Sequence, residues 1–282
     1  MAIKVLIWNE FLHEQEDAKI KEVYPEGIHN ALKQELSVDE ELEITTATLE
    51  MPNHGLSEEI LQNTDVLIWW GHMAHVRVKE EIAEMVAKHV RLGMGFIVLH
   101  SGHHSKPFRK LVGTTGNLSW REIGESERVW IIDPNHPICQ GVGRFIDIPK
   151  EEMYGEPFDI PVPDELLMIG WYKGGEVFRS GCVFKRGNGK IFYFQPGHEE
   201  YPTYHIPQVV QVIKNAVHYV KPVVHLNDQG PGFMASPCVD PAEPGILEMY
   251  NVEEKPSDSF KKMMEGSGAN VVAQMEKDGL KW

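Results

Sequence analysis

The chain has 282 residues, of which 42% are hydrophobic, and a formal net charge of −15 at pH 7. This length suits one large domain or two small ones, with enough apolar residues for a buried core. The negative charge, with no run rich in lysine or arginine to reverse it, argues against nucleic acid and anionic membranes as partners. The apolar start "MAIKVLIWNEF" is too short for a secretion signal, and no apolar segment approaches the roughly 18 residues that span a bilayer, so we expect a cytoplasmic protein.

The three cysteines, Cys139, Cys182 and Cys238, lie far apart without C-x-x-C spacing. This spacing favours neither a disulfide framework nor a thiolate zinc site. We expect reduced cysteines that act as small buried hydrophobic residues.

Four short apolar or β-branched runs, at 3–8, 42–49, 65–70 and 95–100, alternate with segments of helical period. The runs at 65–70 and 95–100 are apolar throughout, which is typical of parallel strands buried on both faces. The sequence therefore predicts an α/β fold with a mainly parallel central sheet and helices on both faces.

Helix signals fill the gaps between these runs. Segment 25–36 has apolar residues at i, i+4 and i+8, and Ser57 is a candidate N-cap for the next segment. Segment 78–93 has the clearest helical pattern, with Gly93 as its C-terminal cap.

The pattern changes after residue 105. The "GG" and "RGNG" turns within 170–194 predict antiparallel additions to the sheet, and 206–220 predicts a closing amphipathic helix. We therefore expect a domain over 1–220, followed by an extended Pro- and Gly-rich arm over 221–282 with a short helix at 257–265. The arm would pack on another subunit of a homo-oligomer.

Several of the 14 histidines directly follow predicted strands. In an open parallel sheet, ligands bind outside the carboxyl ends of the strands, so imidazoles at these positions would gather at one edge. Histidines elsewhere, at 29, 54, 89 and 218, are expected to be ordinary surface or core residues. The histidines after strands are His13, His72, His75, His100, His103, His104 and His198.

These histidines indicate a metal site. Imidazole and carboxylate ligands suit a divalent ion, with zinc favoured, and leave an open position for substrate. The expected metal ligands are His72, His100, His198 and Glu152. His103 and His104 are adjacent, so we expect at most one of them to join the site.

The carboxylates come from the acidic segment 149–158, which we interpret as a loop. Glu152 beside Tyr154 would serve as metal ligand or general base, together with His100, although acidic loop residues are often only solvated. His13, His103 and Glu199 are expected to bind substrate. Trp8 and Trp70 near strand ends would form a stacking wall for a sugar or belong to the core.

"LHSGH" at 99–103 resembles a nucleophile elbow loosely, because position 99 lacks the glycine of a G-x-S-x-G pattern. Ser101 is thus a weak nucleophile candidate. If His100 occupies the elbow, the imidazole is better suited as a ligand or base than as an acyl acceptor.

Four segments together resemble the trehalose-utilisation (ThuA-like) family over about residues 3–220: "DVLIWWGHMAHVRV", "GFIVLHSGHHSKPFRKLVGT", "EEMYGEPF" and "GKIFYFQPGHEEYP". The resemblance implies a flavodoxin-like three-layer sandwich similar to class I glutamine amidotransferases. His100 or Ser101 stands where those enzymes carry a cysteine nucleophile, so their triad is not assembled. The resemblance also implies a role in disaccharide or keto-sugar metabolism.

Three functions remain open from the sequence. The first is a metal-dependent enzyme that isomerises, eliminates from or hydrolyses a small-molecule carbohydrate. The second is a glutaminase- or peptidase-like hydrolase that uses Ser101 or a cysteine. The third is a non-catalytic sugar-binding or regulatory module on an amidotransferase-like scaffold.

Overall fold

The computed structural model describes residues 2–224 and 226. Nearly all of the expected arm over 221–282, the expected helix at 257–265 and Cys238 lie outside the described residues. The arm, its contact with another subunit and the division at residue 220 therefore stay predictions.

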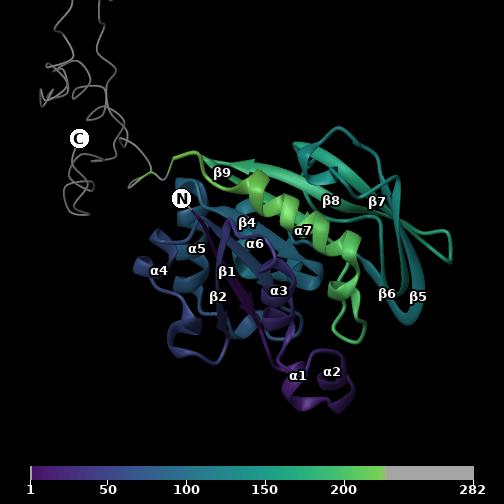
Figure 1. Cartoon of the computed structure of the whole chain (residues 1–282), viewed down its shortest axis with the longest axis horizontal. Helices are drawn as coiled ribbons and strands as arrows, with labels where there is room; N and C mark the ends of the chain where they lie inside the picture. Colours follow the sequence, from purple (N-terminus) through teal and green to yellow (C-terminus); the bar gives the residue numbers. More distant parts are fainter. Residues whose placement is uncertain (1, 225, 227–282) are drawn as a thin grey trace, which may run out of the picture. The chain divides into compact units, whose positions relative to one another are not determined.

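The strands within residues 2–224 form one mixed sheet. Their bounds are β1 Ile3–Asn9, β2 Leu42–Thr48, β3 Val66–Trp70, β4 Gly95–Leu99, β5 Ser119–Ile131, β6 Phe145–Gly155, β7 Glu165–Tyr172, β8 Val177–Arg186 and β9 Gly189–Phe194. The nine strands have the order β2-β1-β3-β4-β9-β8-β7-β5-β6. Figure 1 shows β2 near one end of this sheet and the β5–β6 ribbon at the other.

The strands β2, β1, β3, β4 and β9 form a parallel half of the sheet. All residues of β3 and β4 are buried, as expected for apolar strands covered on both faces. The four early strands expected from the sequence are confirmed, with one end of each shifted by one residue.

The remaining strands, β8, β7, β5 and β6, pair antiparallel. The expectation of a mainly parallel sheet is therefore wrong, and the sheet is mixed. The antiparallel strands predicted within 170–194 are present as parts of the β7–β8 and β8–β9 hairpins, but the two longest strands, β5 and β6, are not among the predicted ones. Their segments carry many charged residues, because one face of an antiparallel ribbon tolerates solvent.

The helices predicted within the described residues are confirmed. Ser57 caps α4 through its hydroxyl, which accepts a hydrogen bond from the Ile60 amide, and Gly93 ends α5 with a φ of 130°. In the described part of the chain, none of the helices is long and apolar enough to cross a membrane. The helix bounds are α1 His13–Glu16, α2 Ala18–Val23, α3 Ile28–Leu36, α4 Glu58–Gln62, α5 Glu80–Leu92, α6 Lys106–Val112 and α7 Pro207–Val220.

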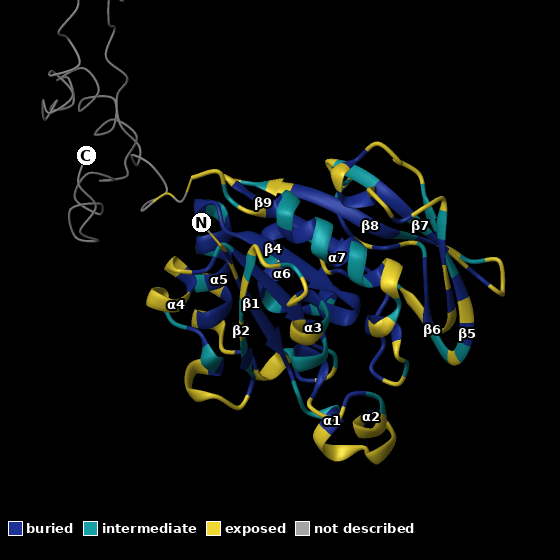
Figure 2. Ribbon diagram, in the orientation of Figure 1, coloured by how far each residue is buried: buried dark blue, intermediate teal, exposed yellow. Residues whose placement is uncertain are grey.

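Helices cover both faces of the parallel half. On one face, α3 and α7 share a core with Val5 and Ile7 of β1. On the other face, α5 and α6 pack in a core with Leu6 and Trp8 of the same strand. Alternate residues of β1 thus enter two cores, and Figure 2 shows the buried sheet between helices with exposed outer surfaces.

Candidate metal centre

A cavity of about 760 Å³ lies where the parallel strands end. Its walls combine chain segments that are far apart in the sequence. Among the residues predicted for the site, it is lined by His13, His72, His103, Glu152, Tyr154, His198 and Glu199.

The strand register explains why three histidines meet. Trp70 of β3 pairs with Leu99 of β4, and Leu99 pairs with Phe194 of β9, so the three strands end at the same level. His72, His100 and His198 follow these ends by two, one and four residues. Parallel strands direct their following loops to one edge, which brings the three imidazoles together.

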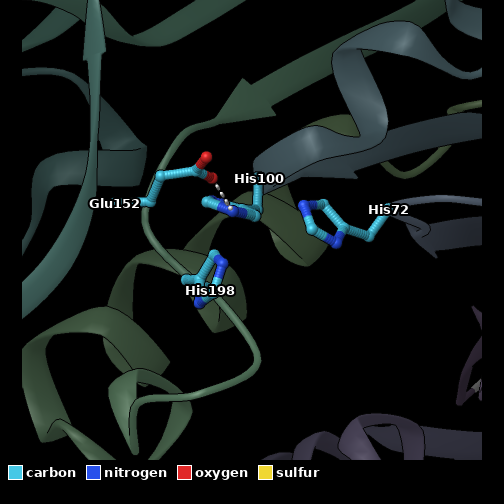
Figure 3. A group of neighbouring side chains, drawn as sticks. All are labelled: His72, His100, Glu152 and His198. Atoms are coloured by element: carbon cyan, nitrogen blue, oxygen red, sulfur yellow. Dashed lines mark ion pairs between the residues drawn. The ribbon is translucent and has the colours of Figure 1, made fainter. Parts of the chain in front are cut away.

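His72, His100, His198 and Glu152 offer one ligand atom each, and these atoms all lie within 4.8 Å of one another. Figure 3 shows the imidazoles of His72 and His198 turned toward His100, with the Glu152 carboxylate on its opposite side. We call these four residues the histidine–glutamate cluster. Three of them are buried, and His72 is half-buried.

His100 occupies a sharp turn directly after β4, with a φ of 48°. Few non-glycine residues adopt this left-handed conformation, which costs free energy and is held by the surrounding structure. Its Nδ1 lies 2.9 Å from the Gln195 carbonyl oxygen, an acceptor, so Nδ1 carries the proton and donates it. Its Nε2 then faces the Glu152 carboxylate, 3.0 Å away, as the atom available to a metal.

The carboxylates around His100 control its charge. Burial alone lowers the pKa of His100, but the contact with Glu152 and the nearby charge of Glu151 outweigh it and raise the pKa to about 9. Without a metal, His100 is therefore protonated at pH 7. Because a metal ligand must lose this proton, a cation that binds here competes with it.

Glu152 and Tyr154 lie on β6, not in a loop as we predicted. Register shifts around Glu125 make the β5–β6 ribbon irregular, and such bulges bend a strand. The end of β6 reaches the parallel half, where Gln195 Nε2 donates to the Glu152 carbonyl oxygen. The Tyr154 ring stacks on His100 with centroids 5.0 Å apart, and its hydroxyl lies 3.3 Å from His100 Nε2.

Glu199 joins two of the predicted site histidines. Its Oε1 hydrogen-bonds to His13 Nδ1 and lies 3.0 Å from His72 Nδ1. Burial raises the pKa of Glu199, but the hydrogen bonds from His13 and His72 outweigh it and lower the pKa far below its usual range. An ionised Glu199 therefore fixes the Nδ1 side of His72 and leaves Nε2 free for a metal, an arrangement common around metal-binding histidines.

Two buried glutamates that we did not predict as site residues hold the loops in place. Glu10, after β1, accepts hydrogen bonds from the backbone amides of residues 72, 73 and 74. Glu151 accepts from the amides of Gly197 and His198 and from the Thr203 hydroxyl. A single sequence carries no signal for these roles, because Glu10 merely follows a strand and Glu151 lies within β6.

The expected tryptophan wall is part of the core instead. Trp8 and Trp70 are each 1% exposed, and neither lines the cavity. Trp8 stacks on Trp69 with centroids 3.8 Å apart, while the Trp70 indole donates to the Gly197 carbonyl. Neither ring offers a free face to a sugar. Both tryptophans therefore belong to the core, which was the alternative to a stacking wall.

His103 and His104 both line the cavity, but neither belongs to the histidine–glutamate cluster. His103 is 3% exposed and its Nδ1 pairs with the Gly116 carbonyl oxygen. Burial lowers the pKa of His103 well below its usual range, so this ring is neutral. It remains a candidate for contact with substrate.

The nucleophiles considered from the sequence are poorly placed for covalent chemistry. The Ser101 hydroxyl donates to the Gly71 carbonyl oxygen at 2.8 Å. Cys139 and Cys182 are buried, and burial raises their thiol pKa values to about 11 and 12. A thiol with so high a pKa is a weak nucleophile at neutral pH.

The family model described as trehalose utilisation matches residues 4–220 of the chain. Two putative ThuA-like proteins have similar structures. The protein from Parabacteroides merdae has a TM-score of 0.58 and 14% identity, with 80% of this chain and 93% of that chain covered. The protein from Bacteroides uniformis has a TM-score of 0.55 and 15% identity, with 75% and 89% covered.

A protein from Salmonella typhimurium described as cytoplasmic is also similar, with a TM-score of 0.55, 12% identity, and 78% of this chain and 100% of that chain covered. At such low identities, these structures establish likeness of fold alone. Among curated proteins, no relative matches the chain.

Proposed function

The chain belongs to the trehalose-utilisation family, and from this premise we propose that it is a metal-dependent enzyme acting on a disaccharide or keto-sugar. The proposed ligands are His72, His100, His198 and Glu152. The observation that carries the proposal is the convergence of their ligand atoms within 4.8 Å beside a cavity of about 760 Å³.

The donor set supports a zinc-like ion. Three imidazoles and one carboxylate are typical zinc ligands, and a sugar oxygen would join them as a fifth ligand, a coordination number that catalytic zinc sites reach. Glu152 Oε2 is buried and lies 3.0 Å from His100 Nε2, so the positive charge that it faces without a metal is the protonated His100, which an ion would replace.

When bound, the ion supplies Lewis acidity toward a carbonyl or hydroxyl oxygen of the sugar. Glu152 would help to hold the ion, and its carboxylate would be the group near the substrate that accepts a proton. Burial raises the pKa of Tyr154 well above its usual range, so its hydroxyl stays protonated and donates a hydrogen bond to a sugar oxygen. His13, His103 and Glu199 line the same cavity and can hydrogen-bond to sugar hydroxyls. These groups suit isomerisation, elimination or hydrolysis.

Two finer expectations belong to the same proposal. A scaffold like that of class I glutamine amidotransferases is supported by the sharp turn at His100, at the position of the elbow after β4. A cytoplasmic location is supported by the description of the similar Salmonella protein.

Metal analysis and a sugar assay on the same protein test the proposal. The full-length chain is purified without a histidine tag, its metal content is measured by mass spectrometry, and it is incubated with trehalose and with a keto derivative of trehalose under NMR observation. We expect one ion per chain, conversion of a sugar, loss of conversion after chelation and recovery with zinc.

A chain that takes up no divalent ion would contradict the proposal. A chain that binds ion and sugar but converts neither sugar would favour the alternative of a sugar-binding or regulatory module.

A further inference from the structure

Trp120 is an exposed aromatic side chain in the wall of the cavity. It lies near the start of β5 and is 65% exposed, although tryptophan is usually among the more buried residue types. The tryptophans that we had considered for sugar stacking, Trp8 and Trp70, are core residues. Trp120 therefore has the open ring face that they lack.

The β-sheet register places Trp120 next to the proposed catalytic groups. Trp120 pairs directly with Tyr154 across the antiparallel strands β5 and β6. Side chains of such a pair point to the same face, with Cβ atoms about 5 Å apart, and both residues line the cavity. The Tyr154 hydroxyl lies 3.3 Å from His100, so Trp120 adjoins the residue that contacts the histidine–glutamate cluster.

A second group near Trp120 has an oxygen without a hydrogen bond. Glu122, two residues along β5, lines the cavity and accepts a hydrogen bond from the Tyr201 hydroxyl through Oε1 at 2.5 Å. Its Oε2 is buried, has no hydrogen-bond partner among the described residues, and lies 3.6 Å from His198 Nε2. Because a buried carboxylate oxygen without a donor is costly, a ligand hydroxyl in the cavity would relieve this cost.

We propose that Trp120 is the stacking platform for a pyranose ring of an unphosphorylated sugar, with Glu122 Oε2 accepting a hydrogen bond from a ring hydroxyl. This inference rests on the proposed carbohydrate function and adds a subsite and a substrate class to it. A pyranose presents an apolar C–H face and a rim of hydroxyls, which match an indole face beside a carboxylate oxygen that has no hydrogen bond.

The charge of the cavity selects a neutral sugar. Within the described residues, no lysine or arginine lines the cavity, whereas phosphate groups are usually bound by these residues. The carboxylates that line it are Glu16, Asp17, Glu122, Glu152, Glu199 and Glu200. A sugar phosphate would meet repulsion from several of them.

Binding experiments on the zinc-loaded full-length chain test this subsite. Trehalose, maltose, sucrose and trehalose 6-phosphate are titrated by calorimetry and observed by saturation-transfer NMR. We expect at least one uncharged disaccharide to bind, Trp120→Ala to weaken it about 10-fold, and Trp120→Phe to keep most of the affinity. Trp171→Ala is the matched control, because Trp171 is 47% exposed on β7 but does not line the cavity.

Metal content and oligomeric state are measured on the same samples. The subsite is overturned if no uncharged disaccharide binds, if Trp120→Ala binds it as tightly as the parent chain, or if the phosphorylated sugar binds more tightly. It is also overturned if Trp120→Ala changes only the oligomeric state, since Trp120 would then belong to a protein interface. A chain that binds zinc and an uncharged disaccharide but is unaffected by Trp120→Ala refutes only the subsite, whereas a chain that binds no zinc or none of the sugars also contradicts the proposed function.

Discussion

The two halves of the sheet contribute different groups to the candidate site. The parallel half supplies three imidazoles that follow the ends of β3, β4 and β9, and the strand register places these ends at the same level along the strand direction. The antiparallel half supplies Glu152 and Tyr154 from β6 and Trp120 from β5. The difference suggests that the parallel half sets the metal position, while the antiparallel half completes the ligand set and forms the wall for substrate.

The largest effect is expected from the parallel half. His100→Ala removes a proposed ligand that is also fixed by its bond to the Gln195 carbonyl. We expect zinc affinity to fall by more than about 100-fold, because loss of even a supporting residue around a metal typically costs 10–100-fold. Zinc titration monitored by calorimetry measures it.

His89→Ala is the matched control, since His89 is also buried but pairs with Glu58 on the helical layer. It should bind zinc like the parent chain. If the His100→Ala chain binds zinc as tightly as the parent chain, His100 is not a ligand and the parallel half does not set the metal position.

The antiparallel half is expected to give a smaller effect on the metal. Glu152→Gln keeps the size of the side chain but removes the charge beside His100. Zinc affinity should fall about 10–100-fold, since three imidazoles remain. If Glu152→Gln binds zinc as tightly as the parent chain, the β6 carboxylate is not a ligand.

The Tyr154→Phe variant lacks only the phenolic hydroxyl. It should keep zinc affinity and reduce turnover of the sugar.

The same contrast explains what the sequence could predict. Apolar runs such as 65–70 and 95–100 identify buried parallel strands, and the residues that follow them must lie at one edge, so the meeting of His72 and His100 was foreseeable. The β5–β6 ribbon has charged residues and irregular register, so its strands lack a clear period. Glu152 was therefore assigned to a loop, and Trp120 was overlooked.

Burial also separates residues that look alike in sequence. Trp8 and Trp120 both stand near strand ends, yet the first is 1% exposed and the second 65%. Which of them meets solvent depends on the helices that pack on the parallel half and leave the start of β5 uncovered, and this is a tertiary property. Glu10 and Glu151 were missed for the same reason, because their partners are backbone amides far along the chain.

A residue that positions a ligand without binding the metal should affect zinc affinity less than a ligand does. Glu199→Gln weakens the hold on His72 Nδ1 while leaving all four proposed ligands in place. We expect about a 10-fold loss of zinc affinity. Glu200→Gln, which changes the neighbouring carboxylate in the same cavity wall, is the control and should change affinity little. A loss as large as that of His100→Ala would instead indicate that Glu199 is itself a ligand.

The smallest effect concerns His29 of α3, a helix that packs on the parallel half. Burial of His29 lowers its pKa to about 4, so the folded chain binds this proton less readily than the unfolded chain, whose histidines titrate near 6.5. The resulting contribution of His29 to the free energy of unfolding is fully present above pH 6.5 and is lost as the pH falls toward 4. Between pH 6.5 and 5.5, His29 should lower the free energy of unfolding by about 1 kcal/mol.

Urea unfolding of the zinc-free parent chain and of His29→Gln at these two pH values measures that decrease. The variant should lose about 1 kcal/mol less than the parent chain on acidification. An identical loss in both chains would show that His29 does not stay neutral in the fold.

Anomalous diffraction at the zinc absorption edge, from crystals of the zinc-loaded chain, tests the central claim most directly. The account predicts one strong peak about 2.0–2.2 Å from ligand atoms of His72, His100, His198 and Glu152. No peak in the cavity, or a peak held by His13, His72 and Glu199 with His100 still paired to Glu152, would contradict it.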